Sequence, residues 1–268
     1  CRLTIIDLTE AADQPMLDTS KRYCIVYNGE IFNYLMLREQ LETVDAPFHT
    51  QSDTEVILRL YSKYGTDMLP MLNGYFAFAI YDTLKKTCFI ARDRFGEKPV
   101  YYYEDENCLL FASEIKALLK FPIAKEIDPL ALQEFLQLNY IAEPHSIYPS
   151  IKKLLPGHFI QCSKEKTVLQ SWYTIPVVAI HQSSIKDYAA QQEKLFQLLD
   201  EAVQLRLASD VPLGSFLSGG LDSSIISGLA SKHLKHLPTF SLGFKDDHFF
   251  DETKDAIAVA KHFNTEHT

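Results

Sequence analysis

The chain has 268 residues, of which 47% are hydrophobic and 23% charged, and its formal net charge is −9. This composition is typical of a folded protein long enough for two domains, and it argues against a fibrous or wholly disordered chain. The acidic balance argues against extended nucleic-acid binding, and no apolar run approaches the ~18 residues of a membrane span.

The first two-thirds of the sequence predicts short strands separated by turns, with helices grouped between them. Strands are expected at 2–8, 23–32, 75–81, 87–92, 99–103 and 108–113, with Asn28-Gly29 as a hairpin signal inside the second. One helix is expected at 34–42, with Asn33 as its cap. A second is expected to run from a cap at Ser52 or Asp53 to residue 64, and two more are expected at 114–119 and 129–138. This order predicts a largely antiparallel sheet with helical layers.

A different pattern follows residue 173. Residues 174–184 suit a linker, and the apolar spacing of 185–207 predicts a long helix. Strands at 211–217 and 238–244 then alternate with helices at 223–234 and 251–263. A βαβα order predicts a parallel sheet that binds ligands at the carboxyl ends of its strands.

The stretch Leu217-Ser218-Gly219-Gly220-Leu221-Asp222-Ser223-Ser224 lies at one such end. A strand that turns through two glycines into a helix presents N–H donors and a positive dipole end to phosphate oxygens. Asp222 would repel phosphate without a cation between them, which suggests Mg²⁺. The alternative is an ordinary turn with a serine cap, and the stretch is not a Walker A motif because the Gly-Lys-Ser/Thr ending is missing.

Several strings in this order resemble glutamine-hydrolysing asparagine synthetases of the B type. They are RLTIIDL (2–8), NGEIFNY (28–34), SDTEV (52–56), GYFAF (74–78), ARDRFGEKP (91–99), ASEIK (112–116), LPGH (155–158) and SDVP (209–212), followed by the Ser-Gly-Gly stretch. The resemblance implies an α+β domain at 1–173 with the αββα fold of N-terminal-nucleophile hydrolases, a class II glutamine amidotransferase. After the linker at 174–184, it implies an α/β ATP pyrophosphatase domain at 185–268, similar to adenine nucleotide alpha hydrolases. Both domains are expected to be truncated.

The resemblance also implies a glutamine pocket in the first domain, lined by Arg2, Asn28, Gly29, Glu30 and Asp53. The planar guanidinium of Arg2 suits the α-carboxylate, and the two acidic side chains suit the α-ammonium group. Asn28 and the Gly29 N–H would form the oxyanion hole. Taken singly, these residues equally suit a hairpin turn, a helix cap and a surface ion pair.

The attacking group of this family is an N-terminal cysteine whose own α-amine acts as base. Family members carry it well upstream of the Arg-Leu-x-Ile-Ile-Asp string, so we expect Cys1 to be structural and the nucleophile to be missing. The other cysteines (Cys24, Cys88, Cys108 and Cys162) form no CxxC pair, which predicts a reducing, cytoplasmic environment. Arg92-Asp93-Arg94 is expected to be a structural strand-to-turn motif with internal ion pairs.

In the second domain the resemblance implies ATP as a substrate, bound by Leu217, Ser218, Gly219, Gly220, Asp222, Ser223, Ser224, Leu242 and Gly243, with Asp222 as a Mg²⁺ ligand. The expected reaction forms β-aspartyl-AMP from aspartate and ATP, which ammonia from glutamine converts to asparagine. The expected partners are these small molecules and a second copy in a homodimer, without nucleic acid or membrane. The alternatives are amidation of another carboxylate, as in surface-polysaccharide biosynthesis, or a non-catalytic glutamine-binding module.

Overall fold

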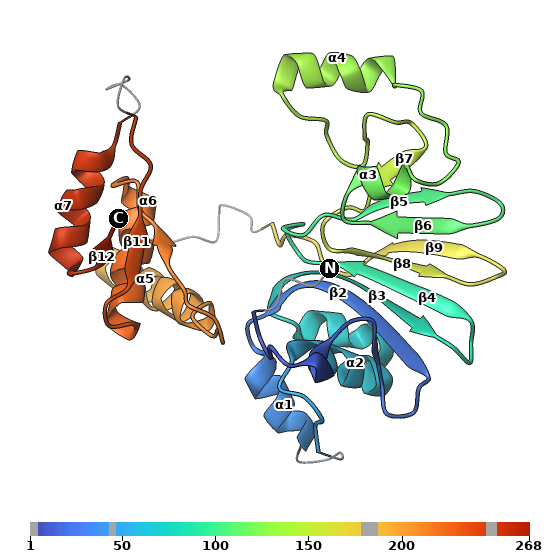
Figure 1. Cartoon of the computed structure of the whole chain (residues 1–268), viewed down its shortest axis with the longest axis horizontal. Helices are drawn as coiled ribbons and strands as arrows, with labels where there is room; N and C mark the ends of the chain where they lie inside the picture. The colour runs from blue at the N-terminus through green and yellow to red at the C-terminus, as the bar shows by residue number, and fades with distance from the viewer. Residues whose placement is uncertain (1–4, 43–46, 178–186, 245–250) are drawn as a thin grey trace. The chain divides into compact units, whose positions relative to one another are not determined.

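The computed structural model describes residues 5–42, 47–177, 187–244 and 251–268 (Figure 1). The chain divides into two compact units, Cys1–Pro176 and Val177–Thr268, and each is described here by itself. Most of the linker predicted at 174–184 lies outside the described residues, so its bounds stay a prediction. No helix of the described residues is long and apolar enough to cross a membrane.

The first unit is built on a six-stranded antiparallel sheet in the order β1-β2-β3-β4-β8-β9. A smaller antiparallel sheet in the order β6-β5-β7 lies against it (Figure 1). The strands of the first sheet are β1 (Met16–Leu17), β2 (Tyr23–Ile31), β3 (Gly74–Asp82), β4 (Thr87–Arg92), β8 (His158–Cys162) and β9 (Thr167–Ser171). Those of the second are β5 (Tyr101–Glu104), β6 (Leu109–Ala112) and β7 (Ile151–Lys153).

Strand β3 contributes to two hydrophobic cores because its side chains alternate between the faces of the sheet. Phe76 and Phe78 point into the core under the helices, together with Ile57 of the second helix. Ala77 and Ala79 point into the core between the two sheets, which also contains Ile90, Val100, Leu154 and Ile160. Both faces of this strand are therefore buried.

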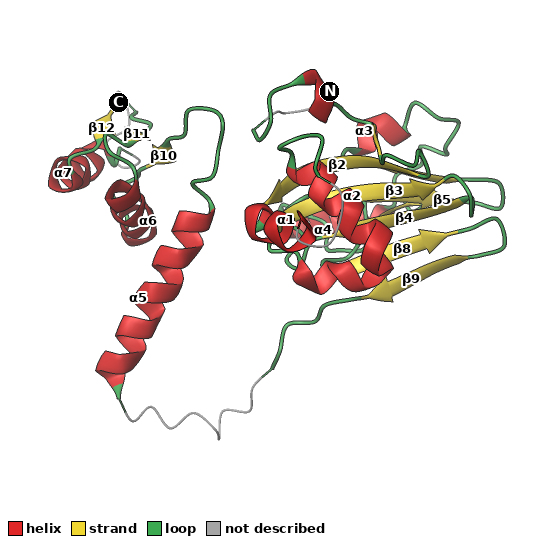
Figure 2. Ribbon diagram, turned by 90° about the horizontal axis from the view of Figure 1, so that it is seen from below, coloured by secondary structure: helices red, strands yellow, loops and turns green. Residues whose placement is uncertain are grey.

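The helices of the first unit are η1 (Glu10–Ala12), α1 (Tyr34–Glu42), α2 (Asp53–Tyr64), η2 (Gly65–Met71), α3 (Ile115–Leu118) and α4 (Pro129–Leu138). Helix α2 lies over the face of the large sheet (Figure 2), whereas α4 stands away from both sheets (Figure 1). Helices α1 and α2 pack on the six-stranded sheet, and α3 packs on the three-stranded sheet through Leu118 and Ile151. The layers run helix, sheet, sheet, helix, which confirms the predicted αββα fold.

The second unit contains a parallel sheet in the order β10-β11-β12. Its elements are α5 (Tyr188–Leu205), β10 (Ser215–Phe216), α6 (Leu221–His233), β11 (Pro238–Phe240), α7 (Thr253–Phe263) and β12 (Glu266–His267). The predicted alternation of strands and helices and the parallel pairing are confirmed. Strand β12 was not among the predicted elements.

Three local predictions are wrong. Of the strand predicted at 2–8, residues 2–4 lie outside the described residues, and 5–8 form a bend and an irregular segment instead of a strand. Asp7 has a φ of 53°, and its carboxylate accepts hydrogen bonds from the backbone of Thr9 (3.1 Å) and Gln51 (2.7 Å). Only Ser215–Phe216 of the predicted strand 211–217 pairs with β11, and Pro212 has no N–H for a ladder. Asn28-Gly29 lies inside the continuous strand β2 and makes no hairpin.

Helix α1 begins where it was expected, but the side chain of Asn33 does not cap it. Its amide instead bonds to the last residue of η2 and to the loop that follows. Nδ2 donates to Met71 O (3.0 Å), and Oδ1 accepts from Asn73 N (2.9 Å). The cap of α2 is Ser52, whose Oγ accepts from Thr54 N at 3.1 Å. Asp53, the alternative cap, is thereby available to a different partner.

Candidate functional site

A cavity of about 310 Å³ in the first unit brings together four of the residues predicted to bind glutamine. Asn28, Gly29 and Glu30 reach it from β2, and Asp53 reaches it from the start of α2. The fifth residue, Arg2, lies outside the described residues, as does Cys1. Strand β2 and the start of α2, which are far apart in the sequence, thus meet at one cavity.

The edge of β2 that faces this cavity presents backbone N–H groups at every second residue. Tyr27 N donates to Gln14 Oε1 at 2.6 Å, and Ile31 N donates to Asp53 Oδ2 at 3.1 Å. By the same alternation, Gly29 N–H points to this edge between the other two. Its position suits a hydrogen-bond donor to a bound ligand.

Glycine is required at position 29 because another strand approaches it closely. A Cβ there would lie 2.2 Å from Tyr75 O and 2.7 Å from Phe76 Cα, both backbone atoms of β3. Neither atom can move without breaking the β2–β3 ladder, in which Gly29 is paired with Phe76. Gly29 therefore serves strand packing rather than a turn.

Two buried carboxylates of the cavity each accept a hydrogen bond from a tyrosine hydroxyl. Tyr27 Oη donates to Asp53 Oδ2 at 2.8 Å, and Tyr75 Oη donates to Glu30 Oε2 at 2.9 Å. Asp53 is 5% exposed and Glu30 is 6% exposed. Burial, together with the charge of Asp53 and the hydrogen bond to it, raises the pKa of Tyr27 well above its ordinary value, so this hydroxyl stays protonated as a donor.

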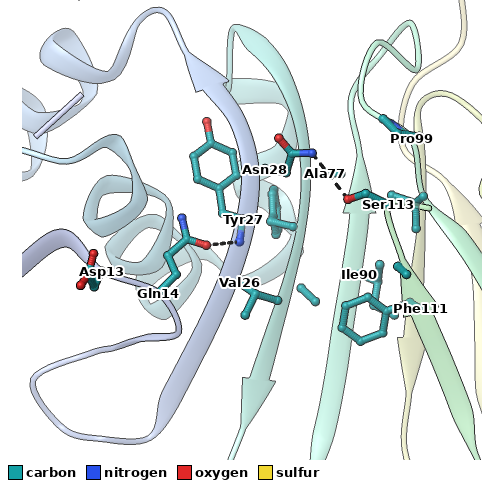
Figure 3. A pocket seen from close by; sticks show the side chains of 14 residues that line it. Asp13, Gln14, Val26, Tyr27, Asn28, Ala77, Ile90, Pro99, Phe111 and Ser113 are labelled. Atoms are coloured by element: carbon teal, nitrogen blue, oxygen red, sulfur yellow. Dashed lines mark hydrogen bonds between the residues drawn. The ribbon is translucent and has the colours of Figure 1, made fainter. Parts of the chain in front are cut away.

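A second cavity, of about 520 Å³, shares Gln14, Tyr27, Asn28 and Ser113 with the first. Figure 3 shows the amide of Asn28 directed at Ser113, at an Nδ2–Oγ distance of 3.5 Å. Apolar side chains such as Val26, Ile90 and Phe111 line the rest of it. Asn28 therefore lies on the wall that the two cavities share.

The Arg92-Asp93 motif has the predicted structural role, but the expected internal ion pairs are wrong, because the ion pair of Arg92 is made with distant Glu143. Arg92 is ion-paired with Glu143 at 2.8 Å and donates to the carbonyl oxygens of Gly96 and Lys98. The carboxylate of Asp93 accepts backbone N–H bonds from Phe76, Phe95, Glu97 and Lys98. These contacts fix the turn after β4 that carries Lys98 to the cavity wall.

In the second unit, the predicted phosphate loop follows β10 and leads into α6. Gly220 is the residue before the helix, and no side chain caps it, so the serine-cap alternative does not hold. Ser218 Oγ and Ser223 Oγ lie 3.0 Å apart, and Ser224 Oγ donates to Gly220 O at 2.7 Å. The hydroxyls thus gather at the N-terminus of α6, where backbone donors and the helix dipole favour an anion.

Gly219 allows this loop to pass close to another helix. Its φ is 85°, and a Cβ would lie 2.6 Å from backbone atoms of Asp255 and Ala256 at the start of α7. Among the other predicted ATP-binding residues, Leu217 is 1% exposed and packs on Ala256 and Ala260, whereas Leu242 is 78% exposed. Leu217 therefore presents its side chain to the core, and only its backbone belongs to the loop.

Asp222 lies in the first turn of α6 and is exposed, close to the loop hydroxyls in sequence. Within the described ranges, no group of three or more His, Cys, Asp or Glu side chains could hold a metal ion. A single carboxylate does suit Mg²⁺ that is bound mainly by phosphate oxygens, which is its usual mode with nucleotides. The carboxylate of Asp222 therefore suits a Mg²⁺ ion that a nucleotide's phosphates also bind.

Sequence patterns did not identify the residues that orient the predicted glutamine-binding side chains. Tyr27, Tyr75 and Gln14 are joined to the cavity residues by contacts between segments that are far apart in the chain. Such contacts leave no local periodicity. A tyrosine directly before Asn-Gly also suits a strand, so its type alone gave no signal.

The chain matches the models of two families in succession. Residues 1–173 match the glutamine amidotransferase domain, and residues 194–268 match asparagine synthase. Among curated relatives, asparagine synthetase [glutamine-hydrolyzing] 1 of Bacillus subtilis (strain 168) is 37% identical over 264 residues, and asparagine synthetase [glutamine-hydrolyzing] 3 of the same organism is 38% identical over 255 residues. These alignments cover 96% and 92% of this chain, but only 40% and 41% of the relatives' lengths.

Among solved structures, a glutamine phosphoribosylpyrophosphate amidotransferase from B. subtilis aligns with a TM-score of 0.43 and 16% identity, covering 95% of this chain and 48% of that one. The first family model covers more than half of the present sequence. The last 75 residues match the asparagine synthase model, and the chain belongs to the glutamine amidotransferase domain family.

Proposed function

We propose that the protein makes asparagine in two coupled reactions. Glutamine hydrolysis in the first unit supplies ammonia, and the second unit takes part in forming β-aspartyl-AMP from aspartate and ATP. The observation that carries the proposal is the order of two family matches on one chain, with relatives named glutamine-hydrolysing asparagine synthetases aligned across both units.

In the first unit, the residues around the 310 Å³ cavity have the chemistry that free glutamine requires. Asp53 and Glu30 accept hydrogen bonds from the α-ammonium group, and the guanidinium of Arg2 binds the α-carboxylate. Asn28 Nδ2 and Gly29 N–H stabilise the oxyanion that develops when the side-chain amide is attacked. We assign no nucleophile among the described residues, and Cys1 lies outside them.

In the second unit, the loop at 217–224 binds the phosphates of ATP. The aspartate carboxylate attacks the α-phosphorus and forms a new P–O bond. The bond between the α-phosphorus and the oxygen that bridges it to the β-phosphorus breaks, and pyrophosphate is released. The backbone N–H groups of Gly219 and Gly220 and the hydroxyls of Ser218, Ser223 and Ser224 stabilise that leaving group. Leu242 and Gly243 border the nucleotide, and Asp222 holds Mg²⁺, which neutralises phosphate charge when bound.

The proposal includes a cytoplasmic location and a homodimer. Its central test is ATP–pyrophosphate exchange by the complete gene product with a panel of carboxylates. We expect exchange with aspartate, followed by formation of asparagine, AMP and glutamate when glutamine is added. Exchange with another acid and none with aspartate would replace asparagine synthesis by amidation of that acid.

A separate measurement tests the glutamine half. Hydrolysis of glutamine to glutamate, followed in the same protein, should occur and should fall when Asp53 is changed to Asn. Glutamine binding without any hydrolysis would favour a non-catalytic glutamine-binding module.

A further inference from the structure

Strand β2 supplies two hydrogen-bond donors to Asp53 Oδ2. Tyr27 Oη donates at 2.8 Å and Ile31 N at 3.1 Å, on either side of the Asn28-Gly29 pair. One strand therefore carries the proposed oxyanion donors and also orients the carboxylate proposed to bind the α-ammonium group.

The contact between Tyr27 and Asp53 is a hydrogen bond from a neutral phenol to a buried carboxylate. Such charge-assisted bonds are stronger than those between neutral groups, and a low-dielectric surrounding strengthens them further. The Tyr27 ring packs partly against the core under the helices, while its hydroxyl reaches into the cavity wall. The ring and the hydroxyl can therefore be tested separately.

The two hydrogen bonds differ in what they can fix. The bond from Ile31 N comes from the backbone and does not depend on the side chain of Tyr27. The bond from Tyr27 Oη is the side-chain contribution of β2, and it restricts rotation of the Asp53 carboxylate about its terminal bond. The other carboxylate oxygen, Oδ1, accepts a longer bond of 3.5 Å from Ser52 Oγ. Without the restriction from Tyr27, Asp53 keeps its charge. Its carboxylate, however, spends less time in the orientation that faces the ligand's ammonium group.

We propose that Tyr27 is a positioning residue that makes the cavity selective for amides carrying an α-ammonium group. It acts through Asp53, by aiming the carboxylate at the position that this ammonium group occupies. The inference rests on the proposed function, because it assumes that the cavity binds glutamine.

The test compares two ligands by isothermal titration calorimetry with the 268-residue chain. One is glutamine, and the other is 5-amino-5-oxopentanoate, which is glutamine without its α-amino group. Tyr27→Phe should weaken glutamine binding about tenfold, since one charge-assisted hydrogen bond is lost. It should change binding of the desamino ligand by less than about twofold, because that ligand has no group for Asp53.

A double-mutant cycle separates positioning from packing. Asp53→Asn should reduce the preference for glutamine over the desamino ligand to what Glu30 alone supplies, and adding Tyr27→Phe should then have no further effect. Tyr61→Phe is the matched control. It removes the hydroxyl of a tyrosine whose ring stacks on Phe89 at 5.2 Å and does not line the cavity, and it should leave both affinities unchanged.

Unchanged glutamine binding by Tyr27→Phe overturns the inference and leaves the glutamine pocket standing. Equal weakening of both ligands overturns it as well, because the hydroxyl would then serve the fold. A wild-type chain that does not distinguish glutamine from the desamino ligand overturns the proposed role of Asp53, and the inference falls with it. Thermal unfolding midpoints of all variants check that each one is folded.

Discussion

The guanidinium of Arg22 and the carboxylate of Asp82 form a forked ion pair, with Nη2–Oδ2 at 2.7 Å and Nε–Oδ1 at 3.1 Å. Arg22 directly precedes β2, and Asp82 ends β3, so the pair closes the central ladder of the first unit at one end. Asp82 Oδ1 also accepts from the backbone N–H groups of Leu84 and Lys85.

This pair predicts a loss of stability in acid. The hydrogen bond from Arg22 is the main cause that lowers the pKa of Asp82 to about 2, from an ordinary value of 3.8. Because the folded-state pKa is the lower one, the stabilisation is present above about pH 4 and is lost as the pH falls toward 2. Urea unfolding at about pH 6 and about pH 3 should show a larger drop for the wild type than for Asp82→Asn.

Asp67→Asn is the control, since Asp67 is exposed at the surface of the same unit. It should lose as much stability between the two pH values as the wild type does. An equal acid dependence of Asp82→Asn and the wild type would contradict the assignment to this pair.

Gly29→Ala should destabilise the first unit by more than about 3 kcal/mol, because the added Cβ would overlap the backbone of β3. Gly65→Ala is a matched comparison. Gly65 has a φ of 57° and a ψ of −134°, and a Cβ added there would meet no atom within 4 Å, so only backbone strain of about 1–3 kcal/mol is expected. The measurement is urea unfolding followed by fluorescence of Trp172, the chain's only tryptophan, which stacks on Phe76 in the first unit. Similar losses for both variants would show that the close approach is not the cause.

Asp222→Asn should weaken binding of ATP in the presence of Mg²⁺ by about tenfold and leave binding without Mg²⁺ unchanged or stronger, because one carboxylate repels phosphate when no cation intervenes. Calorimetric titration of ATP with and without Mg²⁺ measures both. Glu201→Gln, on the exposed surface of α5, removes the same charge and should change neither affinity. Weaker binding under both conditions would assign Asp222 to the loop structure rather than to the cation.

The described cysteines should react with iodoacetamide at different rates. Burial, with a smaller contribution from neighbouring Cys162, raises the pKa of Cys88 to about 11, so little thiolate exists at about pH 8. Cys108 is exposed and should be alkylated first. Peptide mass spectrometry over a time course measures the order, and earlier labelling of Cys88 would show that strands β4 and β8 separate in solution.

Local sequence signals predicted most elements but misjudged residues whose partners are distant in the chain. Helix α2 and its Ser52 cap follow from adjacent residues, so they could be predicted. Asn28-Gly29 has the composition of a hairpin turn, yet Gly29 is needed because Tyr75 O approaches it across the sheet. Asn33 likewise has the composition of a cap but bonds to Met71 and Asn73.

The candidate site shows the same division. Resemblance supplied Asn28, Gly29, Glu30 and Asp53, and the fold brings all four to one cavity. The tyrosines that hold the two carboxylates could not be predicted, because only the antiparallel pairing of β2 with β3 and the packing of α2 place them. Similarly, the contact of Gly219 with the start of α7 depends on how the parallel sheet packs its helices.

The continuity of β2 sets a fixed distance between the two ends of the proposed glutamine pocket. Gly29 N–H and the Ile31 N–H that holds Asp53 are two residues apart on one extended strand, a separation of about 6.8 Å at the usual rise. A regular strand cannot shorten by one bond length without losing its ladder. The distance between the amide end and the ammonium end of a ligand is therefore fixed, and asparagine, one methylene shorter than glutamine, cannot engage both ends at once.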